Sequence, residues 1–83
     1  MASEVQEARF RLADAKRRVK ELQIRGKANA ALIRQALSQF TQDIGEYDIE
    51  AAGLHLKDLE AIREELLTAN REIKDLERFL GQD

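Results

Sequence analysis

The residues best suited to chemistry in this chain are the cations of its first half. A basic run, Lys16-Arg17-Arg18-Val19-Lys20, is followed by Lys27. Such groups on one helix can neutralise the phosphates of a nucleic acid. The competing interpretation is a solvated face on which acidic neighbours such as Asp14 and Glu21 pair with these cations. The residues that we expect to contact a polyanion, if one is bound, are Lys16, Arg17, Lys20 and Lys27.

Other reactive groups are few. The chain has one histidine, His55, and no cysteine. The Glu-x-x-His spacing of di-iron helical bundles is missing, because residue 52 is Ala. Gly26-Lys27 lacks the upstream Gly and the following Ser or Thr of a phosphate-binding loop. We therefore expect a protein that is not an enzyme and uses no cofactor and no metal ion.

The composition indicates which elements carry these residues. The 83 residues include no Pro, only four Gly and 36% charged side chains, which is typical of long helices. The longest purely apolar run, Ala30–Ile33, is too short to span a membrane. The first residues lack the apolar core of a secretory signal. We expect an all-α, single-domain protein of the cytoplasm that does not use a membrane.

The first predicted helix covers residues 4–44. Ser3 and Gln6 have the spacing of a capping box. Two successive steps of four, through Gly26 and Ala30, then predict a local unwinding of the supercoil. Before this interruption, apolar or small residues alternate in steps of three and four, as in a coiled coil: Val5, Ala8, Leu12, Ala15, Val19 and Leu22.

A turn at residues 45–47 and a second helix over residues 48–80 follow. Gly45 is suited to the left-handed conformation that ends many helices, and Asp48 is suited to cap the next one. Asp43 with Glu46 is an alternative cap. Gly81 marks the end of the second helix. Its heptad stripe consists of Leu59, Ile62, Leu66, Ala69, Ile73, Leu76 and Leu80.

Charge predicts how the two helices pair. Residues 1–40 carry nine Lys or Arg and four Asp or Glu, whereas residues 41–83 carry five and twelve. Antiparallel pairing sets basic flanking rows against acidic ones, so we predict an antiparallel hairpin. The expected ion pairs across it, for a fold at Gly45, are Arg18–Glu72, Arg25–Glu65 and Lys16–Glu77. A monomeric three-helix bundle broken near Gly26 and Gly53 is the alternative.

A hairpin of this kind buries only a seam, so its remaining apolar surface predicts self-association, most simply a homodimer forming a helical bundle. We interpret the chain as a protein–protein interaction or oligomerisation module whose partner is itself or another helical protein. Two alternatives remain: a nucleic-acid-associated regulator, and a chaperone-like hairpin that shields a partner helix. The apolar arc expected to meet the partner consists of Ile24, Ala28, Ala31, Leu32, Ile33, Leu37 and Phe40.

Overall fold

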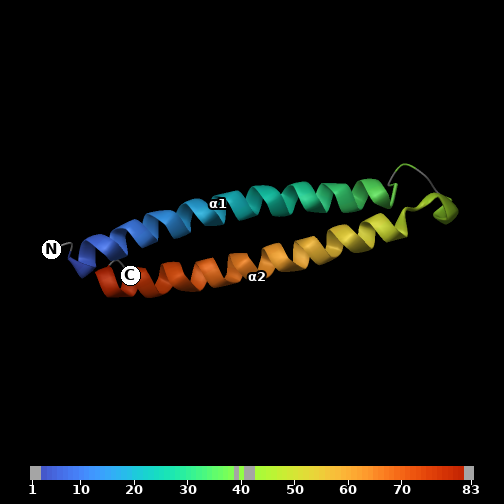
Figure 1. The fold of residues 1–83 in the computed structure, drawn as a ribbon. Helices are drawn as coiled ribbons and strands as arrows, with labels where there is room; N and C mark the ends of the chain where they lie inside the picture. Colours follow the sequence, from blue (N-terminus) through green and yellow to red (C-terminus); the bar gives the residue numbers. More distant parts are fainter. Residues whose placement is uncertain (1–2, 39, 41–42, 82–83) are drawn as a thin grey trace.

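The chain folds into a hairpin of two long helices (Figure 1). The computed structural model describes residues 3–38, 40 and 43–81. Helix α1 spans Glu4–Ala36, the short 3-10 helix η1 spans Ile44–Glu46, and helix α2 spans Ile49–Leu80. The start of α1 and the end of α2 lie side by side at one end, here called the open end, and the connection lies at the other, the loop end. The predicted all-α hairpin is confirmed.

The molecule is a rod. Its principal extents are 63 × 19 × 14 Å and its radius of gyration is 18.4 Å. A compact domain of this length has a radius of gyration of about 12 Å. Gly26 and Gly53 both lie inside unbroken helices. The alternative of a three-helix bundle broken at these glycines is therefore wrong.

Local hydrogen bonds set most of the helix ends. The Ser3 hydroxyl accepts from the Gln6 N–H at 3.1 Å, and the Asp48 carboxylate accepts from the Ala51 N–H at 3.0 Å. Both are the expected N-terminal caps. Gly81 ends α2 with a φ of 72°, in the left-handed region that glycine adopts without steric cost.

Helix α1 ends at Ala36, well before the expected position near 44. Ser38 turns into the left-handed region with a φ of 47°, and its N–H donates to the Gln35 carbonyl at 2.9 Å. The Asp48 N–H donates to the Ala36 carbonyl at 2.8 Å. The residue that precedes α2 therefore provides a hydrogen-bond donor for the last carbonyl of α1. Residues 39, 41 and 42, which the expected longer helix includes, lie outside the described residues.

The connection differs from the predicted turn in one respect. Gly45 lies within η1, where its N–H donates to the Asp43 carboxylate at 2.9 Å. Among the described residues of the connection, Ser38 is left-handed and Gly45 is not, so the expected left-handed role of Gly45 is wrong. Tyr47 follows η1 and is half-buried.

The buried residues recur every seven positions on both helices. One row runs along each helix, and Leu12 joins the α1 row from the neighbouring seam position. The row of α1 keeps its step of seven past Gly26, so the expected interruption of the repeat does not redirect the buried seam. At the open end Ala8, Leu12 and Leu76 form an apolar cluster. The two rows are Ala8, Ala15, Leu22 and Asn29 on α1, and Ile62, Ala69 and Leu76 on α2.

The register of the hairpin follows from where α1 ends. Asn29 meets His55, and Ala36 meets Asp48, so both pairs are centred on position 42. The sequence-based estimate was centred on Gly45. This shift changes one expected ion pair, as described below.

Candidate interaction surface

Two long sides of the hairpin flank the buried seam, and they differ in chemistry. One carries a row of ion pairs between the helices and is called the ladder side. The other carries an apolar groove and is called the groove side. The groove is lined by α1 and α2 together, near the middle of the rod and toward the loop end.

The groove has a volume of about 440 Å³ and a mainly apolar lining. Its edges are polar: Gln23 and Lys27 on α1, and Glu60 and Arg63 on α2. Leu56 is 50% exposed there, whereas Leu59 and Leu66 are half-buried. The apolar and small residues that line the groove are Leu22, Gly26, Ala30, Leu56, Leu59, Ile62 and Leu66.

Gly26 lowers the wall of the groove on the α1 side. A Cβ atom at this position would lie 3.5 Å from Ile62 Cγ2 and 3.7 Å from Leu59 Cδ1, which are ordinary van der Waals distances. The glycine is therefore not required by contact between the two helices. Its missing side chain leaves the α2 leucines accessible from outside the hairpin.

The ladder side carries three ion pairs between the helices. Arg11 lies 3.1 Å from Glu72, Arg18 lies 3.3 Å from Glu65, and Arg25 lies 3.9 Å from the same Glu65. The predicted Arg25–Glu65 pair is confirmed, whereas the predicted Arg18–Glu72 pair is wrong. Glu72 pairs with Arg11 instead, because the two helices pair about position 42 of the sequence and not about Gly45.

These ion pairs orient the helices more than they stabilise them. The side chains of Arg11, Arg18 and Arg25 are 58–63% exposed. Exposed ion pairs each contribute only about 0.2–1 kcal/mol. The apolar seam therefore carries most of the stability, and the ladder selects the antiparallel arrangement.

The candidate polyanion residues are divided by the structure. Lys16 lies 3.8 Å from Glu77, as predicted, and Arg17 lies 2.6 Å from Asp14 and 4.0 Å from Glu21. Lys20 and Lys27 form no ion pair with any of residues 3–38, 40 and 43–81. Half of the predicted set is therefore engaged within the hairpin.

The predicted apolar arc of α1 does not form one face. Ile24 is 70% exposed, and Ala28 and Ala31 are exposed as well. At 100° per residue, Ile24 and Ala31 lie on the side of α1 away from the buried Leu22. The remaining predicted residues are Leu32, which is exposed, Ile33, which is half-buried, and Leu37 and Phe40, which are exposed.

The larger apolar surface needs both helices, and its α2 half was missing from the predicted interaction residues. Leu56, Leu59 and Leu66 supply that half. The available signal was Leu56, which lies three residues before the heptad position Leu59. This spacing widens the apolar stripe of α2 beyond a two-helix seam.

Sequence reasoning also missed Asn29, which is buried in the seam. Its side-chain Nδ2 donates to the His55 carbonyl oxygen at 2.8 Å. A polar residue in such a seam fixes register at some cost in stability. The signal for it was its position, seven residues after Leu22.

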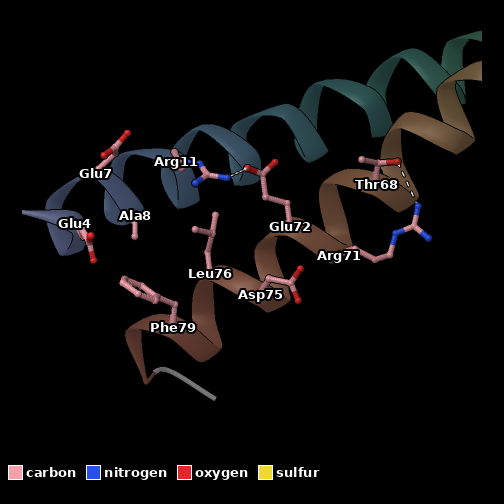
Figure 2. A pocket seen from close by; sticks show the side chains of 10 residues that line it. All are labelled: Glu4, Glu7, Ala8, Arg11, Thr68, Arg71, Glu72, Asp75, Leu76 and Phe79. Carbon is pink, nitrogen blue, oxygen red and sulfur yellow. Dashed lines mark hydrogen bonds and ion pairs between the residues drawn. The ribbon is translucent and has the colours of Figure 1, made fainter.

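A second hollow lies at the open end on the ladder side (Figure 2). Phe79 of α2 extends toward the first turn of α1, and dashed lines join Arg11 to Glu72 and Arg71 to Thr68. Charged groups of both signs form the rim, including Glu4, Asp75 and Arg71. Across the described ranges no three His, Cys, Asp or Glu residues are arranged to hold a metal ion.

No protein-family model, curated protein or solved structure matches the chain. Neither helix of the described part is long and apolar enough to cross a membrane.

Proposed function

We propose that the protein is a non-catalytic protein–protein interaction module that associates with a second copy of itself, two hairpins forming a four-helix bundle. The observation that carries the proposal is the apolar groove between α1 and α2. Ala30, which directly follows the buried Asn29, and Leu56, one turn before the half-buried Leu59, extend it beyond the buried seam. A helix in a four-helix bundle buries a wider stripe than a helix in a two-helix seam, and these positions provide the additional width.

The surface area of the chain supports this. The hairpin exposes 6693 Å². A compact monomer of the same mass exposes about 5,000 Å². A standard interface buries about 800 Å² on each partner, so the excess suffices for one such interface. Large apolar side chains remain exposed on both helices, which is unusual for a protein that works alone.

The test compares two exposed positions on different sides of the rod. Leu56→Glu places a charge in the groove, and Ile24→Glu places the same charge on the outer side of α1. Light scattering after gel filtration should give a two-chain mass for the unchanged protein and for Ile24→Glu at tens of micromolar. Leu56→Glu should give a one-chain mass. A one-chain mass for the unchanged protein, or two chains for Leu56→Glu, would contradict the proposal.

A different helical protein is the second candidate occupant, in which case the hairpin acts as a chaperone-like shield. The same groove favours it, because an amphipathic helix of any origin fits an apolar groove by its i, i+3, i+4 anchors. This candidate would be supported if the hairpin is a monomer that binds an added amphipathic peptide, and if that binding depends on the ability of the peptide to form a helix. Leu56→Glu should abolish that binding, and Ile24→Glu should not.

Lys20 and Lys27 favour polyanion binding as a third candidate, since the described residues offer them no internal carboxylate partner. Heparin retention at about 50 mM salt tests it, because contacts to phosphates or sulfates strengthen steeply as salt falls. Lys20→Gln combined with Lys27→Gln should abolish retention. Lys16→Gln combined with Arg17→Gln is the matched control. Elution of the unchanged protein in the void volume would rule this candidate out.

A further inference from the structure

We infer, building on the proposed self-association, that two copies meet through their groove sides with both loops at the same end. In this arrangement α1 of each copy lies antiparallel beside α2 of the other. A two-fold axis parallel to the helices relates the copies, and each interface is the same on both. Two features of the groove side select it over the arrangements with loops at opposite ends.

The first feature is the change of chemistry along the groove side. The row beside the seam runs in steps of seven on each helix. Toward the loop end it holds Ala30 on α1 and Leu37 directly after the end of α1, and Ile49 and Leu56 on α2. Toward the open end the same two rows hold charged or amide side chains. These polar members are Arg9, Lys16 and Gln23 on α1, and Arg63, Asn70 and Glu77 on α2.

Loops at the same end place the apolar half of one copy on the apolar half of the other. Loops at opposite ends, with full overlap, place Leu56 and Ala30 against positions such as Lys16 and Glu77. Covering those charges with apolar side chains would remove their water without supplying partners, which is costly. With loops at the same end, the Lys16–Glu77 pair, 3.8 Å apart within each copy, faces the polar half of the second copy instead.

The second feature is the charge on the edges of the groove. The α1 edge carries Lys27, and the α2 edge carries Glu60 together with Arg63. Among the described residues Lys27 and Glu60 have no ion-pair partner. With loops at the same end, each Lys27 edge faces the Glu60 edge of the second copy. The outer row of α1 is otherwise entirely basic from its middle onward, so α1 against α1 would set like charges together. That row consists of Lys20, Lys27 and Arg34.

The chain has no cysteine, so single cysteines allow spin labels to be placed at will. Glu4→Cys labels the open end and Glu50→Cys labels the loop end, both at exposed positions. Each labelled dimer then reports one distance between copies. With loops at the same end, both distances should be about 40 Å or less, the width of a labelled four-helix bundle.

Loops at opposite ends would separate the Glu4 labels by nearly the 63 Å length of the hairpin, or more with partial overlap. That result in a protein of two-chain mass would overturn the inference and leave the proposed dimer intact. A one-chain mass with no dipolar coupling from either label would overturn both.

Exchange of charges tests the edge contact independently. Lys27→Glu and Glu60→Lys should each raise the dimer dissociation constant about fivefold or more, because each replaces two attractive edge pairs with repulsive ones. An equimolar mixture of the two variants should recover the original dissociation constant, since each mutated edge then faces its opposite charge on the other chain.

Lys57→Glu, on the outer side of α2, is the matched control and should leave the dissociation constant unchanged. A mixture that binds no tighter than either variant alone would show that Lys27 and Glu60 do not meet between copies.

Discussion

The two halves of the hairpin have the same backbone and different means of holding it together. The open half has an apolar cluster of Ala8, Leu12 and Leu76, and ion pairs that cross between the helices. The loop half has a buried amide, Asn29, and leucines that the partner helix covers only in part. The difference is consistent with our proposal that the open half stabilises the hairpin and that a second copy binds at the loop half.

Of the variants that test this difference between the halves, Leu76→Ala should change the free energy of unfolding most. Leu76 is buried in the open-end cluster, and truncating a buried leucine costs about 2–5 kcal/mol. The free energy of unfolding, from urea titration followed by helical circular dichroism at fixed protein concentration, should fall by that amount. Leu54→Ala, at a position 64% exposed in the loop half, is the control and should change it by less than about 0.5 kcal/mol. Equal losses would mean that the halves do not differ.

Asn29→Leu should make the loop half resemble the open half. The apolar side chain should raise the free energy of unfolding by about 1–2 kcal/mol, because a buried polar contact is replaced by a buried leucine. The register should become less unique, since the bond to the His55 carbonyl is lost. Amide cross-peaks of α2 near His55 should then broaden or double in NMR spectra. Asn70→Leu, at an exposed position, should leave them single.

Gly26→Ala and Gly53→Ala test whether dimer formation requires the absence of a side chain at position 26 of the groove. Each replaces a helix-interior glycine and should raise the free energy of unfolding by about 1 kcal/mol. The new methyl at 26 fits against Ile62, and at 53 nothing lies within 4 Å. If Gly26→Ala stabilises the hairpin but weakens dimer formation, the glycine serves the approach of the second copy. If both variants dimerise equally well, Gly26 has no such role.

Glu65→Gln should have the smallest effect. It removes the carboxylate shared by Arg18 and Arg25, and should cost less than about 1 kcal/mol because all three side chains are partly solvated. The loss should shrink as salt is added, because the surface charges are screened. Glu64→Gln, whose carboxylate has no ion pair in the described part of the chain, is the matched control. A loss that persists in high salt would contradict a solvated ladder.

The parts of the fold that depend on local chemistry could be predicted from the sequence. The caps at Ser3 and Asp48 and the left-handed Gly81 each involve residues within a few positions of one another. The antiparallel orientation also followed from the charged rows, because it sets a uniformly basic row against a uniformly acidic one. These rows are Arg11, Arg18 and Arg25 on α1, and Asp58, Glu65 and Glu72 on α2.

The parts of the fold that depend on contacts between the two helices could not be predicted from the sequence. The end of α1 rests on a hydrogen bond between Asp48 and Ala36, and the ladder partners follow from that register. Asn29 is suited to helix caps by its type, and its burial depends on a carbonyl in the other helix. The predicted interaction residues all came from the first half of the chain, because residues on different helices combine into a groove only once the register is known.

The placement of both helix termini at the open end determines how the hairpin responds to mechanical load. A force applied between the start of α1 and the end of α2 would unzip the seam layer by layer from Ala8 and Leu76, rather than shear all layers together. The last contacts to break would be two hydrogen bonds near the loop end. They join Asn29 to His55 and Asp48 to Ala36. A second copy bound at the loop half would then hold the hairpin closed at the end farthest from the load.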